Sequence, residues 1–254
     1  NVIHLGAKVG GIVENLQSPA DFYNLNTIIN TNVLMMSQRH KVERFTGILS
    51  TCMYPDVVKT YPMTEDHIHL GAPSFANFSY GFTKRSLSVG IEAYNRQYNL
   101  QYNYMIPCNL YGEYDHFEDP EKCHFITALI RKIIDAEKEG KSSIELFGTG
   151  KPLRQFMHAS DLARAIKIMI EHDITESFNV ATTEENSISD MARITLEALN
   201  SDLSVVYNTE KPDGQFRKTV SNKKMLSLMK GFEFTKLEDG VKKVYNEVIK
   251  KYGE

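Results

Sequence analysis

The stretch SYGFTKRSLSVGIEAYNRQYNLQYNYMIP, residues 79–107, decides the predicted fold. Its first part places apolar residues at helical spacing and predicts a helix over residues 80–98. Its second part, residues 100–106, alternates as a strand does and stops at Pro107. A helix that leads directly into a buried strand is typical of a βαβ unit, in which neighbouring strands are parallel.

The flanking sequence extends this alternation in both directions. Buried strands are predicted at residues 2–5 and 45–49, an amphipathic helix begins at Ser18, and another is predicted over residues 124–138. The order strand, helix, strand, helix, strand, helix predicts an α/β fold with a Rossmann-like parallel sheet. Such sheets place ligands at the carboxyl ends of their strands, here the loops GAKVGG, STCMYP and PCNLYGEYDHF.

The second half of the sequence mixes shorter elements. Helices are predicted at residues 161–171, 188–199 and 237–252, and strands at 144–147, 178–181 and 203–207. We therefore expect a smaller C-terminal α/β lobe. The predicted division is a partial dinucleotide-binding domain over residues 1–140 and a mainly substrate-binding lobe over 141–254, with chain crossings between them.

Composition excludes several classes of function. The chain has 254 residues, and 29 basic against 32 acidic side chains give a formal net charge of −3. This balance argues against a nucleic-acid or anionic-membrane surface. No apolar run approaches the roughly 18 residues of a membrane span, and no signal peptide opens the chain. Three cysteines without CxxC spacing favour a reducing compartment, so a cytoplasmic protein is expected. The histidines lack metal-ligand spacing, so no metal is expected.

Tyr80 and Lys84 suggest a chemical site. On a helix, positions i and i+4 share one face, and a nearby ammonium lowers the pKa of a phenol, which is roughly 10 when unperturbed. Ser50, at the end of a predicted strand, could bind a substrate carbonyl beside them. Taken alone, the tyrosine and lysine fit a solvated helix face better than an active site, and the hydroxyl at the strand end makes the two interpretations comparable.

Longer sequence motifs narrow the range of protein families that the chain resembles. They are AKVGGI, STCMYP, PCNLYG, GTGKPLRQFMHASDLA and KPDGQFRK. With Ser50, Tyr80 and Lys84, they resemble the extended short-chain dehydrogenase/reductases and, within these, the GDP-L-fucose synthase family. The resemblance runs from Ala7 to the C-terminal helix. It implies epimerisation of GDP-4-keto-6-deoxymannose at C3 and C5, followed by NADPH-dependent reduction at C4.

The resemblance also implies roles for individual residues. Tyr80 would protonate O4, Ser50 would support it, and Lys84 would lower its pKa and hold the nicotinamide ribose. Cys52 and His124 match the base and acid of the epimerisation. Without the resemblance, Cys52 fits a small buried side chain and His124 fits a polar helix start.

The ligand contacts that the resemblance implies fall into two groups. NADP(H) would be contacted by Ser50, Lys84, His124 and the stretch Pro107, Cys108, Asn109 and Leu110. The GDP-sugar would be contacted by Lys132, with Arg131 as an alternative cation, and by Phe147, Arg154 and Asp213. A homodimer is also implied, formed by the helix that begins at Ser18 and the helix that carries Tyr80.

One expected feature is missing from the sequence. A dinucleotide fold holds pyrophosphate on a Gly-rich turn after its first strand, and no GxGxxG occurs here. We expect that about two or three βα units precede Asn1 in a longer enzyme. The alternatives are a truncated, non-catalytic nucleotide-sugar-binding or subunit-interaction module, and another nucleotide-sugar epimerase or dehydratase of the same family.

Overall fold

The computed structural model describes residues 1–117, 123–211 and 213–252. The chain forms two compact units, each built from three segments. Unit 1 comprises Asn1–Cys108, Ala165–Ala181 and Val220–Phe232, whereas unit 2 comprises Asn109–Arg164, Thr182–Thr219 and Glu233–Glu254. The chain crosses from one unit to the other after residues 108, 164, 181, 219 and 232. The first segment of unit 1 ends at residue 108 rather than at the predicted 140, because the helix after it packs within unit 2.

Unit 1 contains a parallel four-stranded sheet in the order β1-β2-β3-β8, which confirms the predicted fold class. Neighbouring strands pair in register, as Val2 opposite Phe45, Thr46 opposite Asn103, and Met105 opposite Phe178 show. All residues of β2, β3 and β8 are buried, as expected for a parallel sheet covered on both faces. The strands are β1 (Val2–His4), β2 (Phe45–Ile48), β3 (Asn103–Pro107) and β8 (Phe178–Val180).

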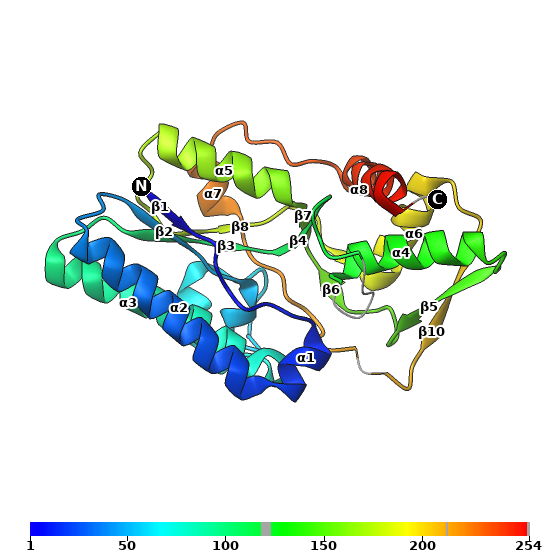
Figure 1. Ribbon diagram of the computed structural model, residues 1–254, viewed down its shortest axis with the longest axis horizontal. Coiled ribbons are helices and arrows are strands. Elements are labelled where there is room, and N and C mark those ends of the chain that lie inside the picture. Colours follow the sequence, from blue (N-terminus) through cyan, green and yellow to red (C-terminus); the bar gives the residue numbers. More distant parts are fainter. Residues whose placement is uncertain (118–122, 212, 253–254) are drawn as a thin grey trace. The chain divides into compact units, whose positions relative to one another are not determined.

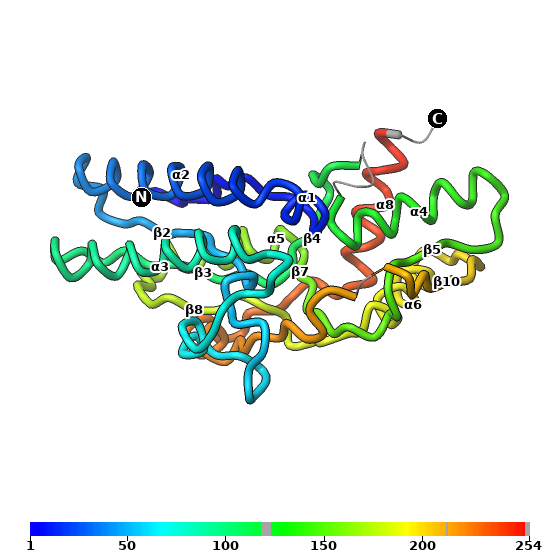
Figure 2. The backbone as a smooth tube through the Cα atoms, turned by 90° about the horizontal axis from the view of Figure 1, so that it is seen from below, coloured from blue at the N-terminus to red at the C-terminus, as the bar shows by residue number. Residues whose placement is uncertain are grey.

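Two long helices lie side by side on one face of this sheet, α2 (Pro19–Arg39) and α3 (Phe78–Tyr98) (Figures 1 and 2). Pro19 starts α2 at a position where its missing N–H costs nothing. Asn99 ends α3 in the left-handed conformation, at φ 54°. The shorter elements of unit 1 are α1 (Ile12–Gln17), α7 (Lys223–Leu228), η1 (Thr51–Met53), η2 (Glu65–His67) and η3 (Phe75–Asn77).

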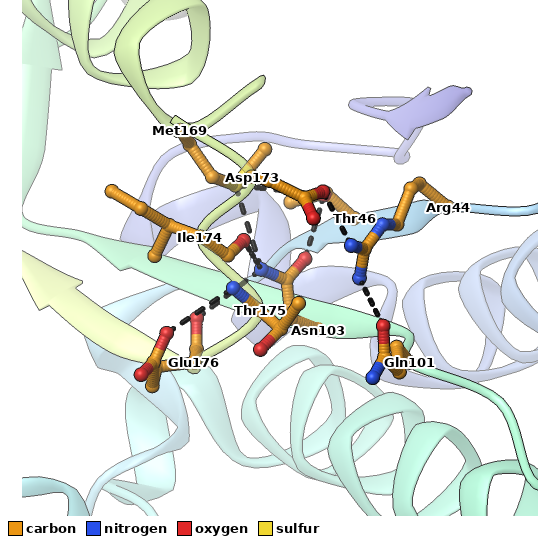
Figure 3. Close-up of polar contacts among 9 residues, drawn as sticks. All are labelled: Arg44, Thr46, Gln101, Asn103, Met169, Asp173, Ile174, Thr175 and Glu176. Carbon is orange, nitrogen blue, oxygen red and sulfur yellow. Dashed lines mark hydrogen bonds and ion pairs between the residues drawn. The ribbon is translucent and has the colours of Figure 1, made fainter. Parts of the chain in front are cut away.

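A polar cluster lies at the amino ends of β2 and β3 (Figure 3). Asn103 accepts a hydrogen bond from Thr46 at 2.6 Å and donates to the carbonyls of Ile174 and Glu176 at 3.2 Å. Arg44 pairs with Asp173 and donates to Gln101. A cavity of about 380 Å³ is lined by these side chains. Because the lining groups already pair with one another, the cluster anchors the end of α5 (Ala159–Glu171) to the sheet.

Unit 2 is built around three helices and a pair of parallel strands, β5 with β10. One apolar cluster joins the three helices through Ile126, Ile130, Met191, Val241 and Val244. A second cluster covers the strand pair with the inner faces of α4 and α6. The elements are β4 (Asn109–Tyr111), α4 (Phe125–Lys138), β5 (Ser143–Phe147), β6 (Leu153–Arg154), β7 (Phe156–His158), β9 (Asn186–Ser187), α6 (Ile188–Leu199), β10 (Ser204–Asn208) and α8 (Leu237–Tyr252).

Within the described residues, no helix combines the length and the apolar character that crossing a membrane requires.

Candidate functional site

The turn after β2 carries the first two site residues. Ser50 has extended backbone and caps the short helix η1, its Oγ accepting a hydrogen bond from the Cys52 amide at 3.2 Å. Cys52 is half-buried on this turn, whereas Thr51 and Met53 on either side are buried. The carboxyl end of a parallel strand therefore presents a hydroxyl and a thiol together.

The first turns of α3 bring Tyr80 and Lys84 to the same place. The Lys84 ammonium donates to the Ile48 carbonyl of β2 at 2.8 Å and lies 5.8 Å from the centre of the Tyr80 ring. The Ser50 side chain lies close enough to the Tyr80 phenol to lower its pKa. The structure thus places Ser50, Cys52, Tyr80 and Lys84 in one cluster within unit 1. Phe22 of α2 meets the Tyr80 ring edge-on, at 6.4 Å between ring centres.

Burial sets the protonation of this cluster. Desolvation raises the pKa of Tyr80, the negative charge of a Cys52 thiolate adds to the rise, and the adjacent Ser50 side chain opposes it. Desolvation lowers the pKa of Lys84 to about 8, with Cys52 opposing. The expected lowering of the Tyr80 pKa by Lys84 is therefore wrong in this structure. Tyr80 is a protonated phenol at neutral pH, a state suited to donating a proton.

Arg85, which follows Lys84, holds the turn that carries Cys52. Its buried guanidinium donates to the Met53 carbonyl through Nε at 3.1 Å and Nη2 at 2.5 Å, and to the Gly71 carbonyl through Nη1 at 2.8 Å. A buried charge needs several such bonds to offset its desolvation. Arg85 was not among the predicted site residues, because backbone carbonyl partners leave no signal in the sequence.

Gly81 is required by the close approach of α3 to this turn. A Cβ at this position would lie 2.4 Å from the Cys52 carbonyl oxygen and 2.9 Å from Pro73 Cβ. We expect Gly81→Ala to lower the free energy of unfolding by about 1–3 kcal/mol, as overpacking does, although alanine is the better helix former. Denaturant titration measures the change.

Gly90→Ala is the matched control for Gly81→Ala. It lies on the same helix, and its added Cβ would meet only the end of the Leu34 side chain, at 3.1 Å. A Gly81→Ala protein as stable as the Gly90→Ala protein would contradict the close approach.

The predicted cofactor stretch, Pro107 to Leu110, lies largely in strands, although a loop was predicted there. Pro107 is the last residue of β3 and pairs with Val180, and the buried Cys108 donates its amide to the Val180 carbonyl at 2.9 Å. Asn109 and Leu110 belong to β4 in unit 2, where Asn109 Nδ2 donates to the Gln155 carbonyl at 3.0 Å. Pro107 and Cys108 thus end a strand that neighbours β2.

His124 lies in unit 2 as the N-cap of α4. Its Nδ1 is 3.0 Å from Oδ1 and 3.2 Å from Oδ2 of Asp115. The hydrogen bond to Asp115 raises the pKa of His124, burial lowers it, and the charge of Asp115 raises it again. Asp115 was not among the predicted site residues, because no fixed spacing links a loop carboxylate to a helix cap nine residues later.

Lys132 and Phe147 meet in unit 2, as their predicted shared role requires. The Lys132 ammonium lies 4.9 Å from the centre of the Phe147 ring and donates to the Glu145 carbonyl at 2.8 Å. Lys211 approaches the same ring at 5.7 Å. Arg131, the alternative cation, instead pairs with Asp135 on its own helix at 2.8 Å. Phe147 is 57% exposed, so an aromatic face flanked by two ammonium groups is available.

Arg154 and Asp213 both bind the chain around the GTG turn. Arg154 donates to the carbonyls of Leu153 at 2.8 Å and Gln215 at 2.5 Å. Asp213 accepts from the Thr149 amide at 2.6 Å and from its hydroxyl at 2.8 Å. These two side chains therefore connect the loop around residues 213–216 to the turn that follows Phe147.

Comparison with known proteins identifies the class. The model of the NAD dependent epimerase/dehydratase family matches residues 1–181, and the chain belongs to this family.

Within the family, the chain is similar to GDP-L-fucose synthase of Dictyostelium discoideum, with 36% identity over 99% of this chain and 79% of that protein. It is also similar to GDP-L-colitose synthase of Yersinia pseudotuberculosis, with 33% identity over 95% of this chain and 79% of that protein. A crystal structure of a GDP-L-fucose synthetase from Naegleria fowleri bound to NADP superposes with a TM-score of 0.87 at 32% identity, covering 99% of this chain and 77% of that one. The resemblance that the sequence strings indicated is confirmed.

Proposed function

We propose that this protein converts GDP-4-keto-6-deoxymannose to GDP-L-fucose, by epimerisation at C3 and C5 and NADPH-dependent reduction at C4. The observation that carries the proposal is the cluster of Ser50, Cys52, Tyr80 and Lys84 at the carboxyl end of β2. The similarity to GDP-L-fucose synthases supports the substrate class.

The residues of unit 1 fit a nicotinamide cofactor. Within the described part of the chain, the Lys84 ammonium has one hydrogen-bond acceptor, the Ile48 carbonyl, so two of its three N–H groups remain for the ribose hydroxyls. Pro107 and Cys108 would lie along the nicotinamide. NADPH, when bound, supplies the electrons for the reduction at C4.

The side chains of the cluster would move and hold protons. Tyr80, a protonated phenol, would donate its proton to O4 of the sugar, and Ser50 would hydrogen-bond the same oxygen. A carbonyl at C4 acidifies the hydrogens on C3 and C5, and the negative charge that develops on O4 is stabilised by these two donors. The Cys52 thiolate would remove the acidic proton, and His124 would return one as the acid.

The GDP end would be bound by unit 2. Phe147 offers an aromatic face, and Lys132 and Lys211 beside it offset the negative charge of the diphosphate. Arg154 and Asp213 would complete this site. Lys132 supplies charge without the bidentate geometry of an arginine.

The complete protein, incubated with GDP-4-keto-6-deoxymannose and NADPH, tests the proposed reaction. We expect NADPH oxidation, followed by absorbance, together with GDP-L-fucose detected by NMR of the product. The same assay with a 3-deoxy analogue of the substrate separates this activity from that of a colitose synthase. Absence of both NADPH oxidation and GDP-L-fucose would overturn the proposal.

We also place the protein in the cytoplasm. Cys52, Cys108 and Cys123 are free of disulfides in the structure, which fits a reducing compartment.

We further propose a homodimer formed through α2 and α3. Leu25, Ile28 and Met36 expose an apolar stripe on α2, and Val89 is half-exposed on α3. The double change Ile28→Glu and Val89→Glu should halve the mass measured by light scattering, because a buried like-charge pair opposes association. Leu70→Glu, at an exposed loop position, is the control. An unchanged mass in the double variant would exclude this interface.

A further inference from the structure

We propose that Asp115 is a positioning residue for His124: it fixes the ring so that Nδ1 is held and Nε2 faces outward to exchange protons. This inference rests on the proposed acid role of His124. Its geometry lies wholly within unit 2, in the contact between the loop after β4 and the first residue before α4.

The Asp115 carboxylate is held independently of the His124 ring. Its side chain is only 10% exposed. Oδ1 accepts the His116 amide at 2.9 Å, and Oδ2 accepts the His124 amide at 3.3 Å. The Asp115 amide itself donates to the Gly112 carbonyl at 3.3 Å. The carboxylate is thus aimed at the amino end of α4, where the helix dipole also favours a negative charge.

The His124 ring has two different nitrogens as a result. Nδ1 contacts both oxygens of Asp115, so it must carry a hydrogen and donate. Within the described residues, Nε2 has no hydrogen-bond partner, and the side chain is 54% exposed. The nitrogen that can give up or take a proton is therefore the outward-facing Nε2.

The electrostatic effect acts in the same direction. Among the described residues, Asp115 is the charged group that acts on the His124 ring, and it raises the pKa of His124 against the opposing effect of burial. His124 in turn lowers the pKa of Asp115, which keeps the carboxylate charged. Arg131 on α4 is paired with Asp135. The pair therefore favours an imidazolium that can act as an acid near neutral pH.

Histidine NMR on the complete protein tests the inference without any substrate. In the ¹⁵N-labelled wild type, we expect the neutral imidazole of His124 to carry its hydrogen on Nδ1. In Asp115→Asn, the titration midpoint should fall by about one pH unit, since an adjacent opposite charge typically shifts a pKa by one to three units. Asp135→Asn, which removes a carboxylate from α4 without touching His124, should leave the midpoint unchanged.

Asp115→Glu is the control for the possibility that Asp115→Asn acts by disturbing the loop. It retains the charge on a longer arm and should recover most of the midpoint shift. A wild-type His124 with hydrogen on Nε2, or an Asp115→Asn midpoint equal to that of the wild type, would overturn the inference.

Exchange of the C3 and C5 hydrogens with D₂O separates this inference from the proposed reaction. At pH 7.5, Asp115→Asn should exchange about tenfold more slowly than wild type, which corresponds to one unit of pKa. The alkaline limb of its pH profile should move to lower pH. A wild type that exchanges neither hydrogen would refute the proposed function, while the NMR result would still decide the role of Asp115.

Discussion

Tyr80→Phe should lower the rate of NADPH oxidation by roughly 10²- to 10⁴-fold, the range that a positioned general acid contributes. The Tyr80 phenol has a raised pKa and lies beside Ser50 in the cluster. A raised pKa keeps the proton on Tyr80 until negative charge develops on O4. Phenylalanine removes the proton and retains the ring that packs against Phe22.

The fold should therefore survive this change, and the loss should be in turnover. Initial rates at saturating GDP-4-keto-6-deoxymannose and NADPH measure it. Tyr94→Phe is a matched control, because it makes the same change on the same helix, where Tyr94 packs on Tyr98 instead. A Tyr80→Phe enzyme that reduces the substrate within threefold of wild type would remove Tyr80 as the proton donor.

Cys52→Ser should slow deuterium exchange at C3 and C5 by roughly 10²-fold or more. A serine hydroxyl is a far weaker base than a thiolate at neutral pH, although it differs by a single atom. The Cys52 amide would still donate to Ser50, so the turn after β2 should keep its shape. NMR of substrate incubated in D₂O follows the exchange of each hydrogen separately.

Cys123→Ser is the control for Cys52→Ser. Cys123 donates through its Sγ to the His116 carbonyl in unit 2, and a serine hydroxyl can donate to the same acceptor. Exchange at the wild-type rate in Cys52→Ser would show that another group removes these protons.

The long elements were predictable from periodicity alone. The predicted helices at 188–199 and 237–252 coincide with α6 and α8, and the strand and helix order of unit 1 is the predicted one. Each of these elements carries its own apolar pattern along several turns or along a whole strand. The short elements β4, β6, β7 and β9 were not predicted as strands, because two or three residues contain no period and pair only through tertiary contacts.

The candidate site was likewise only partly predictable from the sequence. Ser50, Tyr80 and Lys84 could be selected because strand ends and helix spacing place them together. Asp115 and Arg85 could not, since their partners are fixed by loop conformation and by carbonyl groups that every residue has. The direction in which the Tyr80 pKa shifts could not be predicted from the sequence either, because it depends on how completely the phenol is buried.

Because unit 1 is built from three separate segments of the chain, its sheet is completed only late in synthesis on the ribosome. Its sheet receives its last strand only at Phe178–Val180, and its final segment ends at Phe232. The N-terminal segment therefore leaves the ribosome with β3 unpaired on one edge, and it stays so while the next 70 or so residues are synthesised, a period of several seconds at typical rates. An unpaired strand edge is a template for association with other chains. The open edge of β3 therefore stays exposed to association with other chains until β8 has been made.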